Sequence, residues 1–144
     1  ETSVRLRAIA TNLGARKPSE ASEYWRTYLR LCPSDAEAWF VFGRCLIASG
    51  ADQEAEAAFK RTVEVDKEHS LGWAALGFLA ERRDAIQDAV RFYGRSVEFD
   101  RHNGELLAEY ARVLTKAGDT QTAELVQQQL DEISQGTGRG GRTH

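Results

Sequence analysis

Side chains that could carry chemistry are scattered along the chain. Its thiols are Cys32 and Cys45, and its imidazoles are His69, His102 and His144. Two cysteines are too few for a disulfide framework, and they do not lie at a spacing typical of metal ligands. The sequence also has no glycine-rich phosphate loop and no HExxH zinc motif. We therefore expect buried or half-buried free thiols, solvated loop histidines, no metal site and no cofactor.

Carboxylates are numerous, but their spacing is not that of a catalytic pair. Glu64 and Asp66 are matched further along the chain by Glu98 and Asp100, which stand in an equivalent sequence context. Carboxylates that recur in this way are more typical of solvated helix ends than of an acid and base flanking a substrate. We predict that the chain has no catalytic residues and is not an enzyme by itself.

Charge and hydropathy exclude two classes of partner. The chain has 19 basic and 22 acidic side chains, a net charge of −3, and residues 1–134 hold 17 of the basic and all of the acidic ones. An acidic body does not attract a phosphate backbone, so we predict no nucleic-acid partner. The longest stretch without Asp, Glu, Lys or Arg, residues 69–80, is far shorter than the roughly 20 residues of a membrane span.

The end of the chain differs from the rest in composition. Residues 135–144 contain four glycines together with Arg139 and Arg142. Such a composition predicts a flexible tail. Nucleic-acid binding through this segment is the less favoured alternative, because it has no aromatic side chain to stack on bases.

A 34-residue repeat organises the remainder. Residues 36–69 and 70–103 are clear copies that share, among other residues, Trp39 with Trp73 and Gly43 with Gly77. A third copy with a terminal cap covers 104–134, and a degenerate first copy covers 3–35. One unit cannot bury its apolar stripe alone, whereas a stack of units can. We therefore predict one array over residues 1–134.

Each repeat predicts two helices. After Ser34 and Asp35, which are good N-cap residues, apolar side chains recur at helical spacing from Trp39 to Leu46, and Gly50 ends the helix. A second apolar stripe follows in residues 55–63 of the same repeat. The sequence thus predicts an all-α fold of about eight helices, of which the last runs from 120 to about 133.

Small and large residues alternate in the predicted helix pairs. We expect Gly43 and Gly77 to face Ala55 and Ala89, which would let the two helices of a pair approach closely. The large side chains, Trp39 and its equivalent in the next repeat among them, should fill the space between pairs. Replacing either tryptophan with alanine is then predicted to cost about 3–5 kcal/mol.

The motif carried by these residues resembles the tetratricopeptide repeat. From Trp39 to Phe59 the chain reads W-x-x-F-G-x-x-L and then A-x-x-x-F, and from Trp73 to Tyr93 it reads W-x-x-L-G-x-x-A and then A-x-x-x-Y. One departure is Asp84, which replaces the turn glycine. The resemblance implies a right-handed α-α superhelix, or solenoid, of about four helix pairs. It also implies a non-catalytic scaffold, adaptor or assembly chaperone.

In the resembling family, the first helix of each pair lines a concave groove that binds peptides or helices. Some members hold a carboxyl terminus there with a Lys/Asn clamp, which this chain lacks, because Phe40, Arg44, Ala75, Glu105 and Glu109 stand at the corresponding positions. The groove positions carried over to this sequence are Glu37, Phe40, Val41, Arg44, Leu71, Ala74, Ala75, Phe78, Arg82, Ala108, Glu109, Arg112 and Lys116.

These groove residues predict the chemistry of a protein partner. Phe40 and Phe78 are expected to be exposed anchors for apolar side chains of an extended segment or amphipathic helix. Arg44 and Arg112 are expected to receive acidic residues that flank those anchors. A homo-oligomer through the irregular N-terminal helices, expected at 3–15 and 18–32, is a further expectation.

Alternatives remain open at this stage. The chain could be the repeat portion of a longer enzyme, or a secretion or assembly factor that positions a partner. It does not begin with Met and shows no charged-then-apolar leader, so we expect a fragment or a processed product. A cytoplasmic location is expected first and a periplasmic one second, although the sequence does not encode the compartment.

Overall fold

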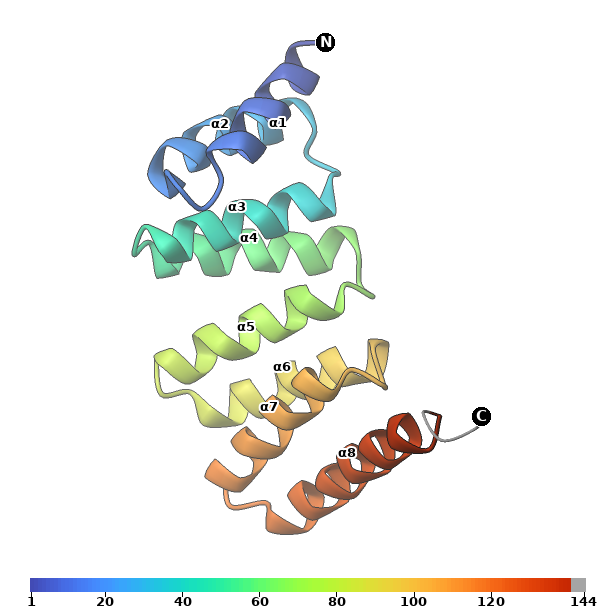
Figure 1. The fold of residues 1–144 in the computed structure, drawn as a ribbon. Helices are drawn as coiled ribbons and strands as arrows, with labels where there is room; N and C mark the ends of the chain where they lie inside the picture. Colours follow the sequence, from blue (N-terminus) through green and yellow to red (C-terminus); the bar gives the residue numbers. More distant parts are fainter. Residues whose placement is uncertain (141–144) are drawn as a thin grey trace. The chain divides into compact units, whose positions relative to one another are not determined.

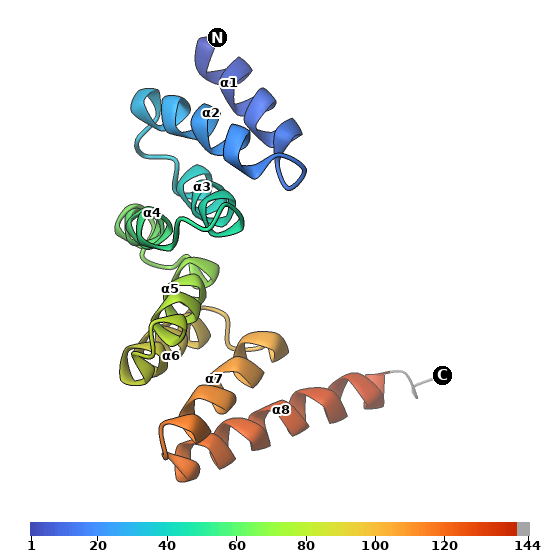
Figure 2. The same cartoon turned by 90° about the vertical axis from the view of Figure 1, so that its left-hand side faces the viewer.

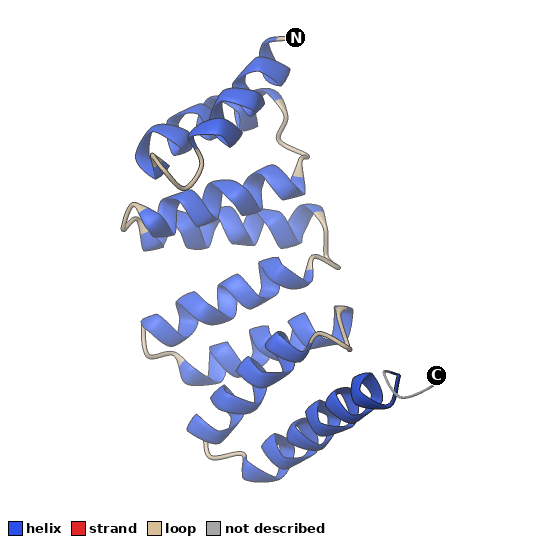
Figure 3. Cartoon of the chain, in the orientation of Figure 1, coloured by secondary structure: helices blue, strands red, loops and turns tan. Residues whose placement is uncertain are grey.

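The computed structural model describes residues 1–140 (Figure 1). Eight helices occupy most of this range, and it contains no strand (Figure 3), which confirms the predicted all-α fold. The chain divides into two compact units, Glu1–Gly72 and the part from Trp73 onward. The boundary falls inside a helix, a few residues after the boundary between the two clear sequence repeats.

The first unit contains two helix pairs. Neighbouring helices pack on one another along the sequence, and Phe59 at the centre is fully buried. Pro18 begins one helix at a position where its missing N–H leaves no bond unmade. The helices are α1 (Thr2–Leu13), α2 (Pro18–Leu31), α3 (Ala36–Ala48) and α4 (Asp52–Val65).

The second unit has two small apolar cores. One joins Ala80, Ala89, Tyr93 and Val113, and the other lies between the last two helices, which Figure 2 shows side by side, and includes Leu107. The helices are α5 (Ser70–Arg82), whose first residues belong to the first unit, α6 (Ile86–Phe99), α7 (Gly104–Lys116) and α8 (Thr120–Gly140).

The repeat register places a capping side chain before three of the helices. Asp35 Oδ1 accepts a hydrogen bond from the Ala38 N–H (3.1 Å), as the N-cap prediction required. Asn103 caps α7 in the same way. His69 stands at the equivalent position, one repeat after Asp35 and one repeat before Asn103. Its Nδ1 accepts a hydrogen bond from the Gly72 N–H (2.9 Å). His69 is therefore a half-buried capping residue of α5, and the expectation of a solvated loop histidine is wrong there.

The turns inside the helix pairs require a left-handed backbone. Gly50 has φ 81° and Gly118 has φ 88°. Asp84, which stands where the other repeats have glycine, adopts φ 63°. The turn geometry is therefore kept without glycine, at the steric cost of a Cβ in the left-handed region.

Close approach within a helix pair depends on a glycine and an aromatic ring. A Cβ added to Gly43 would lie 2.5 Å from the Phe59 ring, and one added to Gly77 would lie 2.8 Å from the Tyr93 ring. The nearest contacts of both glycines are thus with these rings, and the predicted contact with Ala55 and Ala89 stays a prediction. The large residue of the second helix fills the space that the glycine leaves.

The tryptophans lie nearer the surface than predicted. Trp39 and Trp73 are only half-buried. The guanidinium of Arg61 lies 5.5 Å from the centre of the Trp39 ring, and Arg95 lies 5.8 Å from that of Trp73. Each ring therefore has a cation over it, supplied by the second helix of its own repeat.

The helix α8 is longer than the sequence predicted. It runs from Thr120 to Gly140, so residues 135–140 are helical where a flexible tail was expected. Helix propagation adds one hydrogen bond per residue, and each glycine weakens it by about 1 kcal/mol without ending it. The rest of the predicted tail, residues 141–144, lies outside the described residues.

Candidate functional site

The predicted groove positions on α3 differ in exposure. Phe40 is 8% exposed, because its ring packs against Phe59 and against the imidazole of His69, with ring centroids 5.7 and 5.0 Å apart. The prediction that Phe40 is an exposed anchor is therefore wrong. Val41 is half-buried, whereas Arg44 is exposed and its guanidinium lies 5.9 Å from the centre of the Phe40 ring.

The acidic groove position on α3 already has a partner. Glu37 Oε2 lies 3.0 Å from His69 Nε2. Because Nδ1 of the same ring accepts the Gly72 N–H, Nε2 carries the proton when the imidazole is neutral and donates it to Glu37. Sequence reasoning missed this role, although the register shared by Asp35, His69 and Asn103 carried the signal.

The groove positions on α5 include the most exposed apolar side chains of that helix. Phe78 is 42% exposed and Leu71 is 48% exposed. Ala74 and Ala75 are half-buried. The exposed guanidinium of Arg82 lies 5.4 Å from the centre of the Phe78 ring. The expected exposure of Phe78 is thus confirmed, and its role as an anchor stays a prediction.

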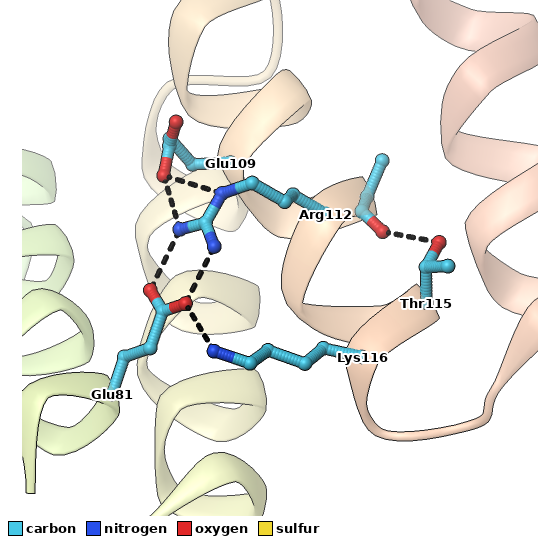
Figure 4. A network of polar contacts seen from close by, with 6 residues as sticks. Glu81, Glu109, Arg112, Thr115 and Lys116 are labelled. Atoms are coloured by element: carbon cyan, nitrogen blue, oxygen red, sulfur yellow. Dashed lines mark hydrogen bonds and ion pairs between the residues drawn. The ribbon is translucent and has the colours of Figure 1, made fainter. Parts of the chain in front are cut away.

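The groove positions on α7 are occupied by an ion-pair network (Figure 4). Arg112 donates from Nη1 and Nη2 to the two oxygens of Glu81, at 2.5 and 2.6 Å, and from Nη2 to Glu109 at 2.6 Å. Lys116 Nζ lies 3.3 Å from Glu81 Oε2. The network ties α5 to α7. Arg112, which is expected to receive acidic residues of a partner, and Lys116 are therefore already paired within the chain.

Glu81 is the least exposed member of this network. Its side chain is 14% exposed, against 46% for Arg112. Hydrogen bonds from Arg112, and then from Lys116, lower the pKa of Glu81 to about 2, although burial opposes the shift. The carboxylate is thus charged at neutral pH and holds both cations on the α7 surface.

The remaining groove position on α7 borders a hollow. Ala108 is exposed and lines, with Arg112, a hollow of about 450 Å³ between α7 and α8. Ala111 and Ala123 form its apolar part, and Glu124 and Gln127 its polar rim. The width of the hollow follows from the small side chains on both helices.

Metal ligands, thiols and membrane spans are the other features of the chain that bear on function. Over residues 1–140, no cluster of three or more His, Cys, Asp or Glu side chains is arranged to hold a metal ion. Cys32 is half-buried and Cys45 is buried, and both are free thiols, as predicted. None of the described helices is both long enough and apolar enough to span a membrane.

Comparison with known sequences links the chain to repeat proteins. No family model matches it. A TPR repeat-containing protein of Dictyostelium discoideum is 30% identical over 99 residues, which are 64% of this chain and 38% of that protein. Anaphase-promoting complex subunit 3 of Schizosaccharomyces pombe is 24% identical over 110 residues, which are 76% of this chain and 16% of that protein. The chain thus spans well under half the length of these relatives.

Comparison with solved structures agrees on the fold. The chain resembles MamA with a TM-score of 0.87 at 14% identity, over 95% of this chain and 81% of that one. It resembles YrrB, described as a TPR protein with an unusual peptide-binding site, with a TM-score of 0.80 at 18% identity, over 93% and 70%. The tetratricopeptide-type helical repeat expected from the sequence is confirmed.

Proposed function

Because this chain is a tetratricopeptide-repeat protein, we propose that it is a non-catalytic protein-interaction module that binds an apolar peptide segment or amphipathic helix of another protein. Its role would be that of a scaffold, an adaptor or an assembly chaperone. The observation that carries the proposal is Phe78, a large aromatic side chain that is 42% exposed on the first helix of its repeat.

Phe78 belongs to a set of four residues whose spacing places them on one surface of α5. Leu71, Ala74, Ala75 and Phe78 follow the i, i+3, i+4, i+7 pattern, which places them on one face of α5. Two alanines between two large exposed side chains leave space for side chains of a partner. Helix-in-groove recognition uses apolar contacts of this kind. The peptide-binding site of YrrB gives a precedent in a protein of this fold.

Ion pairs within the chain limit which basic side chains can pair with acidic residues of a partner. Arg112 and Lys116 are engaged by Glu81, so they are poor candidates for pairing with acidic flanks of a partner. The exposed Arg82 lies beside the Phe78 ring on the same helix, and we assign it the role of receiving an acidic flank.

A peptide-display selection tests the proposal. Peptides selected on the full chain from a random library would be titrated by fluorescence anisotropy against the wild type and two variants. Phe78→Ala should weaken binding by about 2 kcal/mol, as loss of a central aromatic anchor does. Phe99→Ala removes an aromatic side chain of similar exposure (38%) from the end of α6 and should bind normally.

The opposite ranking would overturn the proposal. If the selected peptides bind Phe78→Ala as well as wild type but lose affinity for Phe99→Ala, the surface used lies on the second helices. Failure of the selection to enrich any peptide that binds the wild type would contradict a peptide-binding role altogether.

A further inference from the structure

A second hollow lies in the first unit and is lined by side chains that the predicted groove does not use. It has a volume of about 350 Å³ and lies between α2, α3 and α4. Its apolar floor consists of Leu29, Trp39, Phe42 and Ala58, and its rim includes Arg26, Arg30, Glu54, Ala57 and Arg61. Hereafter we call these nine residues the α2–α4 pocket.

The α2–α4 pocket is separate from the groove positions on the same helix. An α-helix turns by about 100° per residue, so Trp39 and Phe42 lie on the side of α3 opposite to Val41 and Arg44. A ligand in this pocket therefore contacts none of the side chains assigned to the proposed groove.

The floor of the pocket is a fixed aromatic surface. The indole N–H of Trp39 donates to the Pro33 carbonyl (2.8 Å), which sets the orientation of the ring. Trp39 and Phe42 lie with ring centroids 6.1 Å apart. The pocket is open beside them because the neighbouring residue of α4 is Ala58, whose side chain is small. Little ordering is needed before an apolar group can bind there.

The rim has more positive than negative charge. Arg26 lies over the Phe42 ring (5.4 Å to its centre) and pairs with Glu54 (2.8 Å). Arg61 lies over the Trp39 ring and pairs with Glu64 (2.9 Å), which is outside the pocket.

Arg30 is exposed and, among the described residues, has no carboxylate within ion-pair distance. Three guanidinium groups therefore stand at the rim against one carboxylate. The unit as a whole has no such excess of positive charge, because residues 1–72 contain ten basic and eleven acidic side chains.

We propose that the α2–α4 pocket is a second protein-binding site, which takes an acidic peptide segment with one aromatic side chain. The aromatic ring would lie on the floor between the guanidinium groups of Arg26 and Arg61, which stack on aromatic rings. A neighbouring carboxylate would pair with Arg30. The site is independent of the groove on the first helices, so the chain could hold two partners, or two segments of one partner, at once.

The probe is the capped peptide acetyl-Asp-Asp-Phe-Asp-Asp-amide, titrated into the isotope-labelled full chain and followed by NMR. We expect saturable shifts of the Trp39 indole N–H and of amides in α2–α4. Two matched peptides separate the contributions: one with Asn in place of every Asp, and one with Ala in place of Phe. Each should bind at least about five-fold more weakly.

Two pairs of variants locate the site. Arg30→Glu should weaken binding at least about five-fold, whereas Arg5→Glu, an equal charge change at an exposed arginine of α1, should have little effect. Ala57→Tyr should fill the pocket and abolish the Trp39 shift. Gln53→Tyr, an exposed residue of the same helix outside the pocket, should not.

Three outcomes would overturn the proposal. Equal weakening by Arg30→Glu and Arg5→Glu would mean general attraction between opposite charges. Shifts centred on Val41, Arg44 or Phe78 would place the peptide in the groove, which would support the proposed function instead. Unchanged binding by Ala57→Tyr, with a wild-type amide spectrum elsewhere, would exclude the pocket.

Discussion

Repeats 36–69 and 70–103 share the residues that set their helix pairs, but their surfaces differ. Trp39 and Trp73 both lie half-buried under an arginine from the second helix of their repeat. Beside Trp39 stands Ala58, and the hollow there is bordered by the preceding helix α2. The equivalent of Ala58 is Phe92, whose ring stacks on Trp73 with centroids 6.2 Å apart.

The hollow next to Trp73, of about 500 Å³, is bordered by α6 and by Tyr110 of the following helix. The shared residues thus set the helix pair, and the exchange of Ala58 for Phe92 goes with a hollow of different lining. In an array of repeats, function is therefore to be sought at the positions where the copies differ.

The largest expected effect tests which aromatic residues form the shared core. Phe59→Ala and Tyr93→Ala remove rings that are 0% and 3% exposed, and each should cost about 3–5 kcal/mol in the free energy of unfolding. Trp39→Ala should cost about 2 kcal/mol, because that side chain is only partly buried. Urea unfolding followed by circular dichroism measures all three. An equal loss for Trp39→Ala would restore the original prediction of a core tryptophan.

The second prediction concerns the glycine that faces each ring. Gly43→Ala should destabilise the chain by about 2 kcal/mol, because the new Cβ would lie 2.5 Å from a fully buried ring. Gly77→Ala should cost less, since its Cβ would lie 2.8 Å from Tyr93. Phe59→Leu in the same chain should reduce the cost of Gly43→Ala. Additive losses in this double-mutant cycle would show that the two residues do not interact.

A third prediction uses the ion-pair network of the second unit, in which Glu81 is the least exposed member. Glu81→Gln should lower the free energy of unfolding by roughly 1–2 kcal/mol at pH 7, an amount discounted for the half-exposed Arg112. The pKa of Glu81 is lowered to about 2 in the folded chain from 4.5. The contribution of Glu81 to the free energy of unfolding is therefore complete above pH 4.5 and is lost as the pH falls toward 2.

The measurement is unfolding at several pH values. Wild type and Glu81→Gln should differ most near neutral pH and converge in acid. Glu98→Gln is the control, because Glu98 is 61% exposed and lies 3.7 Å from Arg95, and its loss should change little. A difference between wild type and Glu81→Gln that persists at pH 2 would contradict the assigned network.

The smallest expected effect concerns the turn inside each repeat. Gly50→Ala should cost about 1 kcal/mol, because φ 81° is unfavourable for alanine although space is open around it. Asp84→Gly should stabilise by less than about 1 kcal/mol, since relief of the left-handed strain is partly offset by a more flexible unfolded chain. Thermal unfolding shows whether each substitution stabilises or destabilises the chain. Stabilisation by Gly50→Ala would contradict the predicted cost of the left-handed backbone.

The sequence predicted the helices well because the repeat register contains the information for them. Helix pairs, the turn at Gly50 and the cap at Asp35 each follow from local residue types at fixed spacing. The same register could have identified His69 as a cap, but histidine is rarely read in that role. The extension of α8 could not be predicted from composition. Each glycine makes a helix less favourable by only about 1 kcal/mol relative to alanine, so a glycine-rich segment can still continue a helix.

The candidate site was less predictable, because exposure depends on neighbours that are distant in sequence. Phe40 is covered by His69, which stands beyond the whole of α4. Arg112 pairs with Glu81, which belongs to the preceding repeat. A residue pattern within one helix indicates which side chains share a face, whereas the groups that cover or neutralise them come from other parts of the array.

The cap at His69 links the start of α5 to α3. Asp35 and Asn103 accept their backbone hydrogen bonds with oxygen atoms, whereas His69 accepts the Gly72 N–H with Nδ1. The other nitrogen of the same ring, Nε2, lies 3.0 Å from Glu37 Oε2 on α3. Loss of this one side chain would therefore remove a contact on each of two helices.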